Sequence, residues 1–173
     1  MTEKRSQGAA EDRVTHQATI RIVYDRQGRE VEAPVSGFSP DFEKAILLIE
    51  DTTADSDWCR QVLHDMGYNG IQLITNVHTA KDYLDDVLNK LTYPPDAIVL
   101  DIGLGYDSGF EILRKCHANA KLINVPVLVW TSRRDANTET FSMFLGAQDF
   151  LVKSRDSAEF RDTIERLLRD KAA

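Results

Sequence analysis

The chain has 173 residues, of which 42% are hydrophobic and 28% are charged, a balance typical of a globular protein that buries one core. Its formal net charge of −7 makes a nucleic acid an unfavourable direct partner. We find no apolar run of membrane-spanning length and no apolar segment of a secretory signal, so we expect no membrane partner. Cys59 and Cys116 lack metal-ligand spacing, which indicates reduced thiols and a cytoplasmic location.

The first 43 residues differ in pattern from the rest of the chain. Residues 1–18 are polar and aperiodic, which predicts a flexible tail. Apolar and polar residues then alternate over 20–24 and again over 31–35, with the turn-forming sequence DRQG between them, so we expect a β-hairpin. Residues 36–42 are expected to form a linker. We interpret 1–43 as a tail plus an accessory hairpin; an arm for dimerisation or for a partner is the alternative.

From residue 44 onward, short apolar strands alternate with helical patterns. Strands are predicted at 45–50, 71–75, 96–101, 126–131 and 148–152, and helices at about 55–67, 78–91, 109–119, 136–145 and 157–170. Strands that are apolar along their whole length are typical of a parallel sheet buried on both faces. Residues 44–173 are therefore predicted to be one α/β domain, a doubly wound parallel sheet with helices on both sides.

Polar residues with complementary chemistry follow four of these strands. Glu50 and Asp51 end the first, Asp101 the third, Thr131 the fourth, and Lys153 follows the fifth. Ligands of open α/β sheets bind outside the carboxyl ends of the strands, so these side chains should meet at one edge. Three carboxylates would repel one another without a cation, and a few carboxylates with retained waters suit Mg²⁺. The edge is therefore predicted to bind Mg²⁺ and to admit phosphate.

Two more polar residues near the first strand have a simpler interpretation. Asp55 and Ser56 are good N-cap residues for the first helix, and Gly67 is a good residue to end it.

The sequence resembles the receiver domain of two-component response regulators over about residues 44 to 171. The resemblance rests on four segments and on the spacings between Asp101, Thr131 and Lys153, which agree with those of the family. The segments are IEDTTAD at 49–55, DIGLGYDSGFEIL at 101–113, TSRRD at 131–135 and GAQDFLVKS at 146–154. The first of them is similar to the opening of a stand-alone, chemotaxis-regulator-like subgroup. The family implies a five-stranded, flavodoxin-like sheet of order 2-1-3-4-5, counted from the strand at 45–50.

The resemblance also implies roles at the strand ends. Asp101 is implied as the phospho-acceptor, and Mg²⁺ is implied as the cofactor. The implied metal ligands are Glu50, Asp51, Asp101 and the backbone carbonyl of Gly103. A carboxylate can attack a phosphoryl group to give a reactive acyl phosphate, with Mg²⁺ neutralising charge in the transition state.

Three further residues match the positions that read out phosphorylation in this family. Lys153 would pair with Asp101 and then with the phosphoryl oxygens, and Thr131 would donate its hydroxyl to the phosphoryl group. Phe150 takes the position of the family's rotating aromatic residue, with packing as its only means of readout because it lacks a hydroxyl.

The implied function is that of a single-domain response regulator, which is not a conventional enzyme. It would take its phosphoryl group from a sensor histidine kinase or a histidine phosphotransfer protein and would lose it by autodephosphorylation. The chain ends just after the fifth helix, so we expect output by protein contact, with a downstream target or as a homodimer. The expected surface comprises the fourth helix, fifth strand and fifth helix, roughly 136–170.

Three other functions are compatible with this fold class. A phosphorylation-independent interaction adaptor would be favoured if acceptor or metal-binding residues were missing, and none is missing. A phosphohydrolase with an aspartate nucleophile would need an acid two residues after it, where this chain has Gly103. A flavodoxin-like carrier would need a hydroxyl- and glycine-rich loop after the first strand, where EDTTAD would repel a cofactor phosphate.

Overall fold

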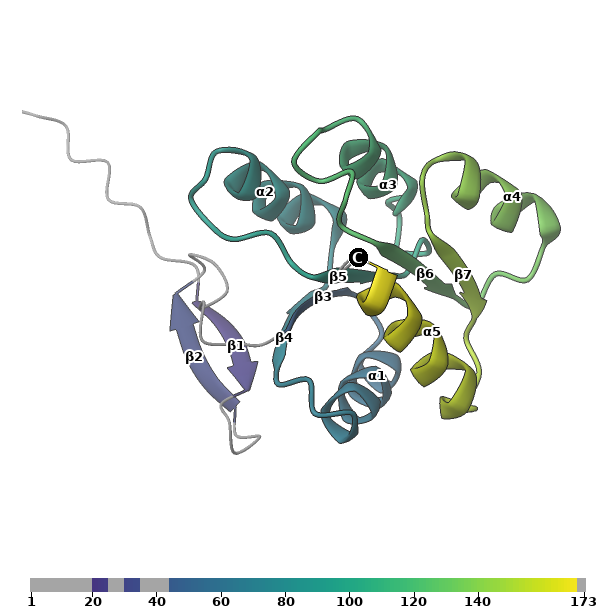
Figure 1. Cartoon of the computed structure of the whole chain (residues 1–173), viewed down its shortest axis with the longest axis horizontal. Coiled ribbons are helices and arrows are strands. Elements are labelled where there is room, and N and C mark those ends of the chain that lie inside the picture. The colour runs from purple at the N-terminus through teal and green to yellow at the C-terminus, as the bar shows by residue number, and fades with distance from the viewer. Residues whose placement is uncertain (1–19, 25–29, 35–43, 171–173) are drawn as a thin grey trace, which may run out of the picture.

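The computed structural model describes residues 20–24, 30–34 and 44–170. Over 44–170 strands and helices alternate along the chain (Figure 1). The strands are β3 (Ala45–Ile49), β4 (Gly70–Ile74), β5 (Ala97–Leu100), β6 (Val127–Thr131) and β7 (Asp149–Val152), and the helices are α1 (Thr53–Asp65), α2 (Val77–Leu88), α3 (Phe110–His117), α4 (Ala136–Phe144) and α5 (Ser157–Asp170).

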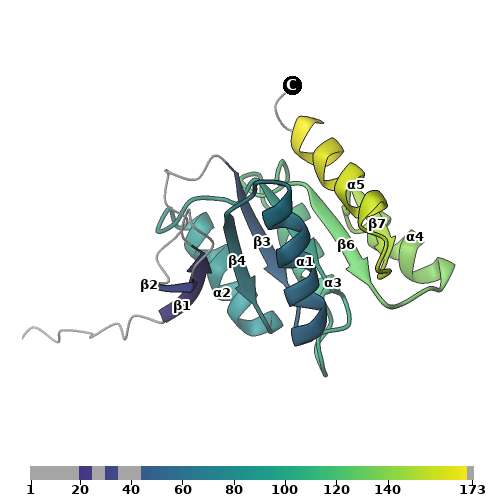
Figure 2. The same ribbon diagram turned by 90° about the horizontal axis from the view of Figure 1, so that it is seen from below.

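These strands form one parallel sheet of order β4-β3-β5-β6-β7, which confirms the predicted flavodoxin-like order. Helices α1 and α5 cover one face, and α2, α3 and α4 cover the other (Figures 1 and 2). Successive side chains of a strand enter opposite cores: Ile46 and Leu48 pack on the α1–α5 side, and Leu47 and Ile49 on the α2–α3 side. All four are fully buried, which explains why β3 is apolar along its whole length.

The first helix begins earlier than the sequence suggested. The carbonyl of Thr52 accepts hydrogen bonds from the backbone N–H groups of Asp55 and Ser56, at 3.1 and 2.9 Å. The helix therefore starts at Thr53, and the prediction that Asp55 and Ser56 are its N-caps is wrong. Asp55 lies instead in the first helical turn, where its side chain is available for other contacts.

Two helix ends are set by residues with positive φ. Gly67 ends α1 as predicted, with a φ of 88°, while the N–H of Tyr68 bonds back to the carbonyl of Leu63 at 3.0 Å. Helix α2 ends at Leu88, before the predicted position near 91, because Lys90 adopts a φ of 61° that a helix cannot continue.

Near the N-terminus, β1 (Ile20–Tyr24) and β2 (Glu30–Pro34) pair antiparallel, which confirms the two strands of the expected hairpin. Strand β1 lies beside β4, the outer strand of the parallel sheet (Figure 1). The predicted turn at 25–28, the tail and the linker lie outside the described residues, and the domain boundary at residue 43 stays a prediction. Among the described helices, none combines the length and the apolar composition that crossing a bilayer requires.

The burial of β3 predicts which side chains can be shortened to alanine without loss of stability. Leu48→Ala removes a fully buried side chain and is expected to lower the free energy of unfolding by about 2–5 kcal/mol. Leu91 is 66% exposed, so Leu91→Ala is the matched control and should change stability by less than about 0.5 kcal/mol. Urea unfolding of both variants measures the difference; similar losses would contradict the packing described here.

Candidate functional site

Three carboxyl groups meet at the carboxyl edge of the sheet. Glu50 and Asp51 follow β3, and Asp101 follows the neighbouring strand β5, so parallel pairing brings them together. Carboxylate oxygens of the three lie within 4.8 Å of one another. Glu50 and Asp101 are buried, whereas Asp51 is exposed to solvent. Like charges at this distance destabilise the folded state unless a cation compensates them.

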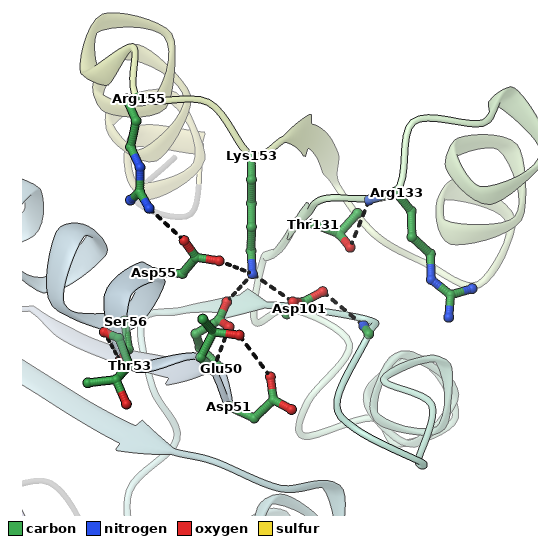
Figure 3. A network of polar contacts seen from close by, with 12 residues as sticks. Glu50, Asp51, Thr53, Asp55, Ser56, Asp101, Thr131, Arg133, Lys153 and Arg155 are labelled. Atoms are coloured by element: carbon green, nitrogen blue, oxygen red, sulfur yellow. Dashed lines mark hydrogen bonds and ion pairs between the residues drawn. The ribbon is translucent and has the colours of Figure 1, made fainter.

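The compensating side chain comes from β7. Lys153 follows Val152, and its Nζ lies 2.6 Å from Oε2 of Glu50 and 2.7 Å from Oδ2 of Asp101 (Figure 3). The other oxygen of Glu50 accepts a hydrogen bond from the backbone N–H of Thr52 at 3.0 Å. Both buried carboxyl groups therefore have a charged partner, which buried charges require.

The surroundings shift the pKa values of this pair. Burial raises the pKa of Glu50 above its ordinary value, against the opposing effect of its hydrogen bonds to Lys153 and Thr52. Burial alone would lower the pKa of Lys153, but hydrogen bonds to Asp101, Glu50 and Asp55 outweigh burial and raise it. Lys153 is consequently a fixed positive charge at neutral pH.

Asp55 joins this network, a contact that the N-cap interpretation missed. Its Oδ2 lies 2.9 Å from Lys153 Nζ, and its Oδ1 lies 2.9 Å from Arg155 (Figure 3). Asp55 thus bridges two cations of the loop after β7. The sequence could have indicated this contact if the helix had been started at Thr53. Asp55 then falls in the first helical turn, next to the ends of the strands.

The loop after β5 folds tightly around Asp101. The backbone N–H of Gly103 donates to Asp101 Oδ1 at 2.8 Å, and the N–H of Gly109 donates to the carbonyl of Ile102 at 3.2 Å. A Cβ at Gly109 would lie 2.6 Å from the carbonyl oxygen of Asp101, so only glycine fits there without a backbone shift. The metal-binding role of the Gly103 carbonyl stays a prediction.

Thr131 and Phe150 lie on the neighbouring strands β6 and β7. Thr131 is fully buried at the end of β6, and its hydroxyl accepts a hydrogen bond of 3.4 Å from the backbone N–H of Arg133. Phe150 pairs with Val129 in register, is half-buried, and packs against the α2–α3 core. Thr131 and Phe150 therefore belong to the same side of the sheet, and their roles in readout stay predictions.

This donor set suits a hard cation. The cluster offers oxygen atoms only, one of its carboxylates faces solvent, and an exposed position leaves space for coordinated water. Mg²⁺ prefers such a site, with one or two carboxylates and several retained waters.

Comparison with known proteins identifies the relatives of this fold. The family model described as response regulator receiver domain matches residues 46–165. The regulatory protein LuxO of Vibrio vulnificus is 28% identical over 122 residues, which cover 70% of this chain and 25% of LuxO. The phosphate regulon transcriptional regulatory protein PhoB of Escherichia coli is 26% identical over 127 residues, 73% of this chain and 52% of PhoB. The chain thus matches only a quarter to a half of these relatives.

Solved structures show the same architecture. The Mn²⁺-bound form of response regulator Rcp1 is 26% identical, with a TM-score of 0.60 over 73% of this chain and 90% of Rcp1. A CheY-like receiver domain protein from Methanospirillum hungatei has a TM-score of 0.62 at 23% identity, over 75% of this chain and 96% of that protein.

The raised pKa of Glu50 predicts how the stability of the metal-free protein depends on pH. Between the ordinary pKa of 4.5 and the raised pKa of the folded state, Glu50 keeps its proton in the folded protein but has lost it in the unfolded chain. This group's contribution to stability therefore falls as pH rises through its folded pKa. Glu50→Gln does not titrate, so the variant should gain stability relative to wild type across that window.

Urea unfolding in EDTA at several pH values, from about 4.5 to 7.5, measures this difference. The exposed Glu139 supplies a matched control, because Glu139→Gln should leave the difference from wild type nearly flat. A flat or falling difference for Glu50→Gln would show that burial does not raise this pKa.

Proposed function

The chain belongs to the response regulator receiver domain family, and we propose that it accepts a phosphoryl group on Asp101 in a Mg²⁺-dependent reaction. The observation that carries the proposal is the position of Asp101. Its carboxylate is buried, lies within 4.8 Å of two further carboxylates, and has the Lys153 ammonium 2.7 Å from Oδ2. An isolated structural acid does not need this combination of a metal-binding cluster and a fixed cation.

In the proposed reaction an oxygen of Asp101 attacks the phosphorus of a phosphohistidine donor. The P–O bond to Asp101 forms as the P–N bond breaks, and the imidazole of the donor leaves with the electron pair of that bond. Glu50, Asp51, Asp101 and the Gly103 carbonyl would hold Mg²⁺, which supplies positive charge beside the phosphoryl oxygens when bound.

The chain's own groups have separate tasks in this scheme. Lys153 stays charged and keeps its ammonium beside the acceptor, so it can pair with a phosphoryl oxygen without moving far. The N–H of Gly103 holds Asp101 Oδ1 and orients the carboxylate. Hydrolysis of the acyl phosphate by water would reset the protein; it is self-modification and not turnover of a separate substrate.

Output is proposed to follow from packing on the α4–β7–α5 side, roughly residues 136–170. A phosphoryl group on Asp101 would attract the Thr131 hydroxyl away from the Arg133 N–H. Phe150, which is only half-buried, would then turn into the space beneath β6. This changed face would bind a downstream protein or a second copy of the chain.

A receiver domain acts with a histidine kinase or phosphotransfer protein, so we propose such a cytoplasmic partner as the phosphoryl donor. LuxO and PhoB are named as regulatory proteins, but this chain matches only part of each. We propose output by protein contact without direct nucleic-acid binding, since the formal net charge of −7 opposes approach to a phosphate backbone.

Phosphorylation of Asp101 is tested with acetyl phosphate or phosphoramidate, with Mg²⁺ or with EDTA. Intact-mass analysis should show one phosphoryl group on the wild type with Mg²⁺ and none with EDTA or in Asp101→Asn. Asp51→Asn should need more Mg²⁺, whereas Asp107→Asn, which alters an exposed residue of the loop that follows Asp101, should behave as wild type. Absence of labelling in the folded wild type at high Mg²⁺ would favour a phosphorylation-independent adaptor.

The switch is tested by NMR with beryllofluoride as the phosphoryl mimic. In wild type, shift changes should spread from Asp101 to Phe150 and the 136–170 face. Thr131→Ala removes the hydroxyl, so the changes should stay near Asp101. Thr140→Ala, at an exposed position of α4, is the control and should keep the wild-type spread. Changes confined to the site in wild type would place the output surface elsewhere.

A further inference from the structure

Lys153 is held by more partners than pairing with the acceptor requires. Three carboxylate oxygens lie close to its ammonium, from Glu50 at 2.6 Å, Asp101 at 2.7 Å and Asp55 at 2.9 Å, and those of Asp101 and Asp55 accept hydrogen bonds from it. The Lys153 side chain is only 9% exposed, so water offers little replacement for a lost partner. We propose that Asp55, itself held by Arg155, is a positioning residue that keeps the Lys153 ammonium over Asp101.

Asp55 can do this because its own carboxylate is fixed. It lies in the first turn of α1 and its second oxygen pairs with Arg155 at 2.9 Å. The guanidinium of Arg155 lies 5.7 Å from the ring centroid of Trp58, one turn further along the same helix. Asp55 and Trp58 thus give α1 two contacts to the loop after β7. Each oxygen of the Asp55 carboxylate has its own cation, Lys153 for one and Arg155 for the other.

Packed aromatic rings on α1, β6 and α5 also help to fix the position of Lys153. Trp58 stacks on Trp130 of β6 with ring centroids 5.3 Å apart, and Phe160 of α5 packs edge-on against both. Lys153 Nζ lies 5.1 Å from the Trp130 ring centroid. The lysine is flexible along its four-carbon stem, so its position depends on such partners.

Asp55 acts through Lys153 and not through the metal-binding cluster. Among the described residues, the carboxylates whose oxygens gather within 4.8 Å are Glu50, Asp51 and Asp101, and Asp55 is not one of them. Removing its charge should therefore loosen the lysine more than it weakens metal binding. This inference rests on the proposed phosphorylation of Asp101, because the position of Lys153 matters for that reaction.

The central variant is Asp55→Asn, which keeps the size of the side chain and removes its charge. The rate constant for labelling by phosphoramidate at saturating Mg²⁺ should fall about tenfold, equal to ~1.4 kcal/mol in activation free energy. Calorimetric Mg²⁺ affinity should change by less than roughly threefold, since Asp55 lies outside the group of carboxylates that would hold the metal and already pairs with two cations. Arg155→Gln alters a residue that is 58% exposed and should give a smaller fall of the same kind.

Two controls separate positioning from a general effect of charge. Asp57→Asn removes a carboxylate from the same helix whose ion pair is with Arg60, at 3.4 Å, and it should leave the labelling rate unchanged. In a Lys153→Met background, Asp55→Asn should have no further effect, because the residue through which it acts is gone. Equal effects in both backgrounds, or equal effects of Asp55→Asn and Asp57→Asn, would overturn the proposal.

A second measurement does not depend on phosphorylation. In ¹H–¹⁵N spectra, a lysine ammonium that is shielded from solvent and held by several carboxylates exchanges slowly with water and gives a visible signal. The Lys153 signal should be present in wild type and Asp57→Asn and should broaden or vanish in Asp55→Asn. An unchanged signal in folded Asp55→Asn overturns the positioning role. Failure of wild type to be labelled, with the signal behaving as expected, instead overturns the proposed function alone.

Discussion

The pairing of one ammonium group with three carboxylates is the interaction on which the carboxyl edge of this sheet depends. Glu50 and Asp101 are buried close together, an arrangement that is unfavourable without a cation. Lys153 supplies the cation from a distant part of the sequence, 52 residues after Asp101 and 98 after Asp55. The site therefore cannot form from a local segment; it exists only when β3, β5 and β7 lie in one sheet, so folding and site assembly are the same event.

This dependence explains why much of the site could be predicted from the sequence. Apolar runs such as 45–49 mark strands that are buried on both faces, and parallel topology forces the residues after them to one edge. The positions of Glu50, Asp101 and Lys153 at this edge follow from that pattern alone. The helix pattern followed from the same alternation, whereas the strand order was implied by the resemblance to the receiver domain family.

Asp55 shows where such reasoning stops. Aspartate in the first residues of a helix serves equally well as an N-cap or as a first-turn residue, and the choice between them depended on the Thr52 carbonyl. A two-residue error in the helix start hid a contact with a lysine 98 positions away. The end of α2 at Lys90 was missed for a related reason, because a non-glycine residue with positive φ leaves no mark in the sequence pattern.

The two faces of the sheet differ in how firmly their helices and loops are held. On the α1–α5 side, ion pairs and the stack of Trp58, Trp130 and Phe160 hold the loop after β7. On the other side, β7 is only half-buried and α4 buries Thr138 and Ser142 while its Phe144 is 78% exposed. Segments with few buried apolar contacts open at the lowest free-energy cost. We therefore expect a new charge at Asp101 to act first on α4 and on Phe150 of β7, while α1 stays fixed and holds Lys153 in place through Asp55.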